Sequence, residues 1–501
     1  MELKSLKTEF YKLVGDGNIF DAIKHSLFSD RKNDILSQYV DMVDGDLETD
    51  NLQKIFQYYH ADRKEKCQDF TPKSIAKLCA AETVTNGGVV YDLCAGSGAL
   101  TIQKWAQDPD KIFICEELDE RVIPLLLFNM AVRNMSGYVI NRNALTLKCA
   151  VCYRLKSGER FSDIQQLDAP PKIEADEIVS NPPYNIKWEP PAPLMADNRF
   201  IGKPIPPASN ANYAFVLTAL DRMKQGGRCA FVLPNSVLSG DDGKEIREYL
   251  INNGLVERII TLPDKMFEST SIGTCVMVFS CDNKAVKMYD CRQKAETERR
   301  DQNGQCGGAS HENRTYHKSV NVMPDSLIGV LCGNCENIPE FSKEVGINDL
   351  RENDYILICS RYIDFREKEE THRPYADIMA DINRIARERS VIKITCNESF
   401  AKQIGIYEVA QLENGGDAEL DKTFALLGGH YENRRYITLT KSKELKIENQ
   451  DKEIWSSLIN FFIPMWKHHV FYLNQEENRL LSELRDAILP DLMSGKLDIT
   501  A

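Results

Sequence analysis

Asn181-Pro182-Pro183-Tyr184 is the stretch of this sequence whose residue types and spacing could do chemistry. It follows the run 177–180, which is typical of a buried strand, and two prolines must end such a strand because proline lacks a ladder N–H. The Asn181 side chain and the Pro182 carbonyl would then stand as two rigid acceptors at the strand's carboxyl edge. Two acceptors can satisfy both donors of a planar exocyclic amine, which frees the nitrogen lone pair to attack an electrophile.

Tyr184 adds a flat face on which a heterocycle can stack, an interaction typically worth about 1–3 kcal/mol per base. The stretch therefore predicts a site that alkylates an aromatic or amide NH2 group. The simpler alternative is an ordinary turn, since Asn and Pro are common turn residues. The sequence upstream favours the site.

A glycine-rich turn precedes this stretch at a suitable distance. The buried-type strand 89–93 leads into Cys94-Ala95-Gly96-Ser97-Gly98, where glycines let the backbone turn tightly and approach a ligand. Such a turn is weak evidence alone, since many doubly wound folds have one. Glu117 follows the next predicted strand, 111–115, about 25 residues after the acid of the first, and could hold both ribose hydroxyls. Asp92 would repel a phosphate, which favours S-adenosylmethionine over a dinucleotide.

Three further segments could border the cofactor or the target. Phe70-Thr71-Pro72 opens a predicted helix over 73–81, with Thr71 as N-cap and N–H groups that suit a carboxylate. Asn143, after the third strand, could hydrogen-bond an adenine edge, or could belong to a surface turn. The proline-rich stretch 188–210 has no period, and we expect this long loop to close over the target or touch nucleic acid.

Strands alternate with helices from residue 85 to 280, which predicts a doubly wound α/β sheet. We expect a helix over 213–223 that is ended by Gly226-Gly227, and an exposed polar excursion over 282–320. Pro490 is expected to end a helix over 475–489, whose apolar stripe could be internal core or a coiled-coil-like seam. The predicted domains are an N-terminal helical domain (1–66), a catalytic domain (67–365) and a C-terminal partner-docking helical region (366–501).

Composition narrows the class of protein. A formal charge of −13 over 501 residues argues against autonomous, non-specific DNA binding, so another subunit would supply much of any grip on nucleic acid. Fifteen cysteines, an odd number, indicate reduced thiols in a cytoplasm. No apolar run is long enough to span a bilayer, and the N-terminus is no signal peptide. Cys332 and Cys335 are better explained as ordinary thiols than as zinc ligands, so no metal is predicted.

Taken together, the motifs resemble those of N6-adenine DNA methyltransferases, and more closely the modification (M) subunits of type I restriction–modification systems. The resemblance runs to about Asp364. Its most telling motifs are Gly226-Gly227-Arg228, Val232-Leu233-Pro234-Asn235, Ile246-Arg247, Leu262-Pro263, Asn353-Asp354-Tyr355 and Ser360-Arg361-Tyr362. The family usually has Asp-Pro-Ala-Cys-Gly-Ser-Gly where this chain has the residues Asp92 to Gly98, so the acid and both glycines are kept.

The resemblance implies a Rossmann-like S-adenosylmethionine-dependent methyltransferase fold and assigns the site residues. Asn181, Pro182, Pro183 and Tyr184 would hold a flipped adenine. The residues expected around the cofactor are Phe70, Thr71, Pro72, Asp92, Ala95, Gly96, Ser97, Gly98, Glu117, Asn143, Ala144 and Asn181. Residues 478–496 resemble instead the closing helix of specificity (S) subunits, which suggests a helix that docks on such a subunit. A truncated specificity domain within this chain is the alternative.

The function implied is methyl transfer to adenine N6 in double-stranded DNA, within a complex that holds an S subunit and possibly a restriction (R) subunit. Two alternatives stay open. The same four residues could hold another planar NH2, in RNA or in a protein glutamine. The chain could also be a cofactor-binding structural subunit without turnover.

Overall fold

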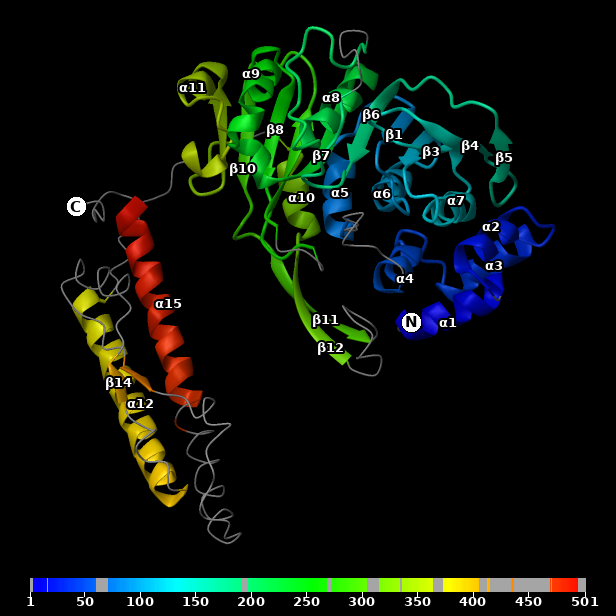
Figure 1. Ribbon diagram of the computed structural model, residues 1–501. Helices are drawn as coiled ribbons and strands as arrows, with labels where there is room; N and C mark the ends of the chain where they lie inside the picture. Colours follow the sequence, from blue (N-terminus) through cyan, green and yellow to red (C-terminus); the bar gives the residue numbers. More distant parts are fainter. Residues whose placement is uncertain are drawn as a thin grey trace. The chain divides into compact units, whose positions relative to one another are not determined.

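The computed structural model describes residues 3–15, 17–59, 71–190, 197–267, 272–303, 315–333, 336–363, 373–404, 412–414, 434–436, 469 and 471–493. The chain divides into two compact units, Met1–Arg366 and Glu367–Ala501 (Figure 1). No helix in the described ranges is long and apolar enough to cross a membrane.

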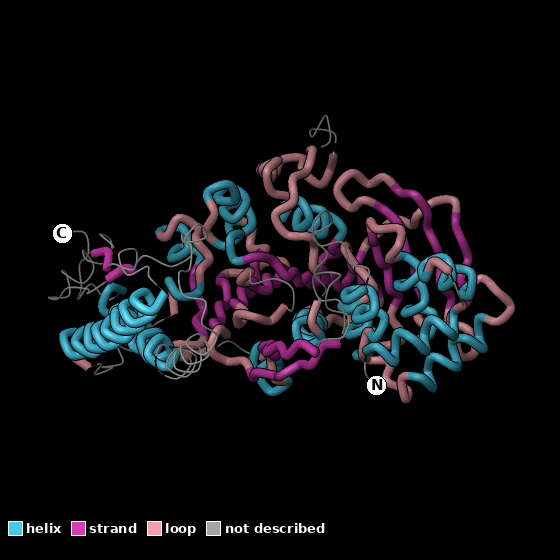
Figure 2. Tube along the Cα trace, turned by 60° about the horizontal axis from the view of Figure 1, so that its bottom comes forward, coloured by secondary structure: helices cyan, strands magenta, loops and turns pink. Residues whose placement is uncertain are grey.

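An eleven-stranded sheet forms the centre of the first unit (Figure 2), in the order β13-β10-β8-β9-β7-β6-β1-β2-β3-β4-β5. Its strands are β1 (Val89–Asp92), β2 (Ile112–Glu117), β3 (Ser136–Arg142), β4 (Cys149–Lys156), β5 (Asp163–Leu167), β6 (Ala175–Ser180), β7 (Met223–Pro234), β8 (Val256–Thr261), β9 (Thr274–Phe279), β10 (Ala285–Asp290) and β13 (Ser342–Gly346). Strands β7, β6, β1, β2 and β3 pair in parallel, so their carboxyl ends meet at one edge.

The α/β class predicted from the sequence is confirmed, but the sheet is mixed rather than purely parallel. Strand β9 lies antiparallel between β7 and β8, and β13 is antiparallel to β10. The hairpin β4–β5, which the sequence analysis did not predict, extends the other edge. Its strands alternate too little in polarity to stand out from a loop.

Helices cover both faces of the sheet. They are α1 (Leu3–Val14), α2 (Ile19–Leu27), α3 (Lys32–Met42), α4 (Asn51–Tyr59), α5 (Lys73–Glu82), α6 (Ala99–Gln107), α7 (Ile123–Val132), α8 (Asn212–Arg222), α9 (Lys244–Asn252), α10 (Asp325–Leu331) and α11 (Ile347–Glu352), with short 3-10 turns at Asn235–Leu238, Asp241–Gly243 and Cys359–Arg361. Alternate strand residues face opposite sides, so Tyr91 and Phe231 join the core under α8 and α9, while Val90 and Val232 face the other helices.

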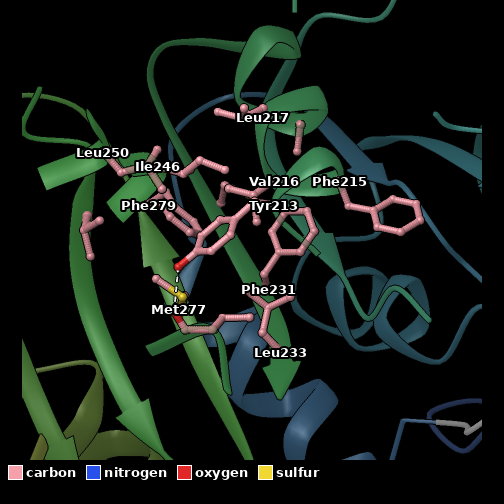
Figure 3. Packing of buried hydrophobic residues seen from close by; sticks show 14 of the residues in the cluster. Tyr213, Phe215, Val216, Leu217, Phe231, Leu233, Ile246, Leu250, Met277 and Phe279 are labelled. Atoms are coloured by element: carbon pink, nitrogen blue, oxygen red, sulfur yellow. Dashed lines mark hydrogen bonds between the residues drawn. The ribbon is translucent and has the colours of Figure 1, made fainter. Parts of the chain in front are cut away.

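One face of the sheet is packed mainly by α8 and α9. Figure 3 shows Tyr213 of α8 lying beside Phe231 and Met277 of strands β7 and β9. The Tyr213 hydroxyl donates a hydrogen bond of 2.8 Å to the Val237 carbonyl, which satisfies the polar tip of a buried ring.

The N-terminal helices share their core with the sheet. Phe10 of α1 and Tyr39 of α3 both meet Phe128 of α7 edge to face, with ring centroids 5.5 and 5.0 Å apart. These rings belong to one buried cluster that also holds Val90 and Phe113 of the sheet. The helices therefore pack directly on the strands that end at the site.

Two predictions about local structure in this unit are wrong. Helix α8 ends at Arg222 and β7 begins at Met223, so Gly226-Gly227 lies within a strand, where Gly226 has a φ of 76°. Residues 282–320 are no simple excursion, because β10 is a buried strand of the central sheet. The remainder contributes the hairpin of β11 (Glu296–Asn303) and β12 (Thr315–Val322). Pattern alone missed β10 because its polar and apolar residues alternate only weakly.

The second unit contains two long helices, α12 (Tyr375–Ile404) and α15 (Phe471–Met493), and the short strands β14 (Leu412–Asn414) and β15 (Arg434–Tyr436). Leu480 and Leu484 of α15 pack against Ile378 and Ile382 of α12, so the predicted stripe is core within this chain. Helix α15 continues through Pro490 to Met493, which contradicts the predicted end. The apolar run 454–466 lies outside the described residues.

Gly137 of β3 lies close against the backbone of β2. It has a φ of 154°, and a Cβ there would lie 1.8 Å from the Phe113 carbonyl oxygen of β2. We expect Gly137→Ala to lower the free energy of unfolding by roughly 2–4 kcal/mol, measured by urea titration. Gly88→Ala, where a Cβ meets nothing within 4 Å, is the control. Equal stability of the two variants would contradict this account.

Candidate active site

A cavity of about 590 Å³ opens at the carboxyl edge of strands β1, β2, β3 and β6. Its lining residues are Thr71, Leu93, Cys94, Ala95, Gly96, Ala99, Glu117, Leu118, Asp119, Glu120, Val122, Asn141, Arg142, Asn143, Ala144, Leu145, Asn181, Pro182, Pro183, Tyr184, Ile186 and Phe215. The cavity thus brings together the glycine-rich turn, the acid after β2, the turn after β3 and the Asn-Pro-Pro-Tyr stretch.

The glycine-rich turn is held against the end of β2. Gly96 and Gly98 have φ angles of 56° and 103°, a backbone region that side chains disfavour. The Ala95 N–H donates to the Glu116 carbonyl at 2.8 Å, and the Gly96 N–H donates to Glu117 Oε2 at 2.9 Å. The turn and Glu117 are therefore one hydrogen-bonded unit.

Glu117 lies in the cavity wall with both carboxylate oxygens already oriented. Oε2 accepts from the Gly96 N–H, and Oε1 accepts from the Asp119 N–H at 2.7 Å. Burial raises the pKa of Glu117, against the lowering effect of these backbone donors. Each oxygen keeps a second lone pair, so the group can accept further hydrogen bonds from ligand hydroxyls.

Asn143 shapes the wall next to Glu117. Its Oδ1 accepts from the backbone N–H groups of Leu145 and Thr146, at 2.9 and 3.0 Å, and so closes a turn. This use of the side-chain oxygen corresponds to the turn alternative of the sequence analysis, although Asn143 and Ala144 do line the cavity.

Asn181 connects the two ends of the site. Its Nδ2 donates to Thr71 Oγ1 at 2.9 Å, and its Oδ1 accepts from the Tyr184 hydroxyl at 2.7 Å. Pro182 is buried behind it, as a proline that ends a strand should be. The Tyr184 ring meets Phe267 edge to face at 6.4 Å. The carboxamide therefore has a fixed orientation at the cavity wall.

Not all predicted site residues line the cavity. Thr71, Ala95, Gly96, Glu117, Asn143, Ala144 and the four residues 181–184 do. Pro72, Asp92, Ser97 and Gly98 are absent from the lining formed by the described residues, and Phe70 lies outside them. Thr71 is not the N-cap of α5, because Pro72 occupies that position and Thr71 instead accepts from Asn181.

Asp92 and Ser97 act from behind the turn. Asp92 is buried and accepts from Thr101 Oγ1 of α6 at 2.9 Å, and burial raises its pKa to about 7. Ser97 is fully buried, with its hydroxyl donating 2.6 Å to Asp50. Both residues thus hold the turn rather than face the cavity.

The two ends of the loop after Tyr184 are connected by hydrogen bonds. The Asn185 N–H donates to Asn212 Oδ1 at 3.1 Å, and Asn185 Oδ1 accepts from Asn210 and Asn212. Trp188 is buried and donates to the carbonyls of Ala208 and Pro207. Residues 191–196 of this loop lie outside the described part, and its closure over a target stays a prediction.

Arg199 connects this loop to the cavity wall. Its guanidinium donates to the carbonyls of Ala144 and Leu145, at 3.1 and 2.9 Å, and pairs with Asp197 at 2.5 Å. Only 3% of Arg199 is exposed. A buried arginine fork between two carbonyls and a carboxylate is a rigid connection, which lysine cannot reproduce.

Several lining residues escaped the sequence analysis. Leu118 could have been noticed, because it is an apolar residue directly after the acid, and 64% of it is exposed. Phe215 of α8 and Arg142 of β3 carried no signal, since each looks like an ordinary residue of its element. The described residues contain no cluster of three or more His, Cys, Asp or Glu that could hold a metal, and Cys335 lies outside them.

A ligand cavity at the carboxyl edge of parallel strands defines an α/β protein of the Rossmann-like class. The family described as N-6 DNA Methylase matches residues 44–371, well over half of the chain. The chain therefore belongs to the N-6 DNA methylase family, whose members are adenine-specific DNA methyltransferases.

Curated relatives agree with this assignment. The methylase subunit of the type I restriction enzyme HindI of Haemophilus influenzae is 25% identical over 378 residues, 71% of this chain and 78% of that protein. The MpnII methylase subunit of Mycoplasma pneumoniae is 29% identical over 60% of this chain and 54% of its own length. This chain thus spans about half of the second relative.

Among solved structures, the type I restriction-modification system methyltransferase subunit of Streptococcus thermophilus aligns with 63% of this chain and 64% of its own. The sequence identity is 25% and the TM-score is 0.47.

Removing the Arg199 fork tests the connection between the loop and the wall. We expect Arg199→Ala to lower the free energy of unfolding by about 2–4 kcal/mol, because Asp197 and two carbonyls lose their partner. Arg199→Lys should recover little of this loss. Thermal and urea unfolding measure both, with Arg154→Ala on the exposed face of β4 as control. Full recovery by lysine would show that charge alone matters.

Proposed function

We propose that this chain is the modification subunit of a type I restriction–modification complex and methylates adenine N6 in double-stranded DNA. The observation that carries the proposal is the single cavity in which Glu117 and the glycine-rich turn meet Asn181 and Tyr184. A nucleoside-binding wall and an amine-binding motif in one cavity suit the transfer of a group from a nucleoside cofactor to an NH2. The similarity to type I methylase subunits supports the same substrate class.

S-adenosylmethionine fits the residues of this wall. Glu117 would hold the ribose hydroxyls, the turn at Asn143 and Ala144 would border the adenine, and the start of α5 beside Thr71 would face the amino-acid end. A phosphate-bearing cofactor would meet the carboxylates of Glu117 and Asp119, and the cation of this wall, Arg142, is already paired with the buried Glu116. When bound, S-adenosylmethionine supplies a methyl group on a positively charged sulfur.

The chain's own residues would then orient the amine. Asn181 Oδ1 and the Pro182 carbonyl accept the two N6 protons, and Tyr184 stacks on the flipped base. Extruding the base costs a few kcal/mol, which these contacts offset. Much of the acceleration would be positional, because nitrogen and methyl carbon are held in line. The N6 proton leaves after alkylation, so no strong base is required.

Recognition of the target sequence is assigned to partners. A chain with a net charge of −13 has no overall basic footprint for DNA. We place the contact with an S subunit on residues 475–501, and an R subunit would join the same complex. Leu480 and Leu484 pack against α12 within this chain, so docking would use the part of α15 turned away from α12.

Asn181→Ala tests the role of the carboxamide. We expect at least a hundredfold loss of methyl transfer with cofactor binding still measurable, because the variant removes an acceptor for the amine and leaves Glu117 in place. Radiolabel transfer and calorimetry measure the two properties. Asn33→Ala, an exposed position on α3, is the matched control. Normal transfer by Asn181→Ala would exclude this mechanism.

Transfer of labelled methyl to DNA, with and without an S subunit, tests the wider proposal. We expect signal only in the presence of the S subunit. Signal from this chain alone would mean that it reads DNA itself. Cofactor binding without transfer in either case would point to an RNA or protein substrate, or to a structural subunit.

A further inference from the structure

Residues 46–53, which connect α3 to α4 and include the first residues of α4, are held by α6 and α7, two helices that follow the glycine-rich turn. Arg133, the C-cap residue of α7, donates to the carbonyls of Leu47 and Thr49, at 2.6 and 3.1 Å. Gln103 of α6 donates to the carbonyl between them, that of Glu48, at 2.7 Å. Three consecutive carbonyls are therefore fixed by two buried side chains, and this segment cannot move independently of α6 and α7.

One set of contacts, called here the Asp50 arm, connects this segment to the glycine-rich turn. Asp50 is buried, and its Oδ2 accepts from the Ser97 hydroxyl at 2.6 Å. Its Oδ1 accepts from the Gln53 N–H and from Asn129 Nδ2, both at 2.9 Å. Asn129 Nδ2 also donates to the Ser97 carbonyl at 2.8 Å. Ser97 is thus held at its hydroxyl and its carbonyl from the side opposite the cavity.

This hold matters because Ser97 stands between two glycines of positive φ, where the backbone has many alternatives. Ser97 directly follows Gly96, whose N–H donates to Glu117. Fixing Ser97 through Asp50 therefore preorganises the wall that would bind the ribose.

A second set of contacts, called here the Gln53 arm, connects this segment to Asn181 of the Asn-Pro-Pro-Tyr stretch. Gln53 Nε2 donates to the Thr71 carbonyl at 3.2 Å, and Thr71 Oγ1 in turn accepts from Asn181 Nδ2 at 2.9 Å. Lys73, the first residue of α5, donates to Thr49 Oγ1 at 3.1 Å. The residue that orients the Asn181 carboxamide is therefore attached to the same segment as Ser97.

We propose that Asp50 and Gln53 are positioning residues of this enzyme, Asp50 for the cofactor wall and Gln53 for the Asn181 carboxamide. The N-terminal helices would then be part of the catalytic apparatus through this segment. The inference rests on the proposed methyl transfer from S-adenosylmethionine.

The roles of Asp50 and Gln53 predict changes in different kinetic parameters of the full chain assembled with its S subunit. Asp50→Ala should raise the Kd and KM for S-adenosylmethionine about tenfold with kcat within about twofold, because one hydrogen bond to the cofactor turn is lost. Gln53→Ala should lower kcat about tenfold and leave the cofactor Kd within about twofold. Calorimetry measures the Kd, and label transfer measures kcat and KM.

Conservative variants separate positioning from general destabilisation. Asp50→Asn can keep its oxygen for the donors of Gln53 and Asn129 and donate its NH2 to the Ser97 hydroxyl oxygen, so it should restore most of the cofactor affinity. Gln53→Glu loses the donor to Thr71 and should behave like Gln53→Ala. Asp41→Ala and Gln38→Ala, on the exposed face of α3, are matched controls expected to resemble the wild type.

Ser97→Ala removes the same hydrogen bond from the other side, in case Asp50→Ala does not fold. The double variant Asp50→Ala, Ser97→Ala should then be no weaker in cofactor binding than either single variant. Additive losses would mean that Ser97 contacts the cofactor itself and would overturn the Asp50 arm. If Asp50→Ala and Gln53→Ala each lowered cofactor affinity, kcat and melting temperature in proportion, the proposal as a whole would be overturned.

The wild type distinguishes the failure of the proposed function from the failure of this inference. Cofactor binding by the wild type without methyl transfer would reject the proposed function. The role of Gln53 would then be rejected too, because it is defined by its effect on transfer. The role of Asp50 would still be decided by the Kd values for S-adenosylmethionine. No cofactor binding by the wild type would reject both.

Discussion

Parallel pairing of β3, β2, β1 and β6 is the constraint on which the rest of this structure depends. The register sets Asp92 beside Cys115 and Val179, so the residues that follow these strands emerge at one edge. Each strand then delivers one part of the site: the glycine-rich turn, Glu117, the Asn143 turn and Asn181. A shift of one residue in any pair would turn that part toward the opposite face of the sheet.

The prolines after β6 complete this arrangement. Pro182 and Pro183 cannot continue the ladder, so the chain leaves the sheet at the point where the Asn181 carboxamide reaches the cavity. Thr71 and Tyr184 occupy the two ends of that carboxamide and fix its orientation. A polar group at the edge of an apolar core is retained only with such partners, because an unpaired buried amide is costly.

The site is supported from two directions by buried arginines. Arg199 binds the carbonyls of the wall at Ala144 and Leu145, and Arg133 binds the carbonyls of Leu47 and Thr49 behind the glycine-rich turn. Guanidinium groups suit this task, because their planar fork satisfies several acceptors at fixed angles. The loop after Tyr184 and the N-terminal segment thus reach the cavity wall without lining it.

The sequence by itself determined the class of fold, the strand-to-turn character of the motifs and ten of the 22 residues that line the cavity. These depend on local chemistry: prolines stop strands, glycines permit left-handed backbone, and apolar runs must be buried. Patterns of polarity could not place β4, β5 and β10, because their side chains alternate weakly and pairing partners decide whether such segments are strands.

Only the tertiary structure decided which motif residues face the cavity and which stand behind it. Ser97 belongs to the same turn as Gly96, and Asp92 ends the strand before it, yet they point to Asp50 and Thr101. Thr71 accepts a hydrogen bond from Asn181 instead of capping its own helix, and the two residues are 110 positions apart in the chain. Such contacts arise from packing between distant segments, and no local rule of propensity or spacing contains that information.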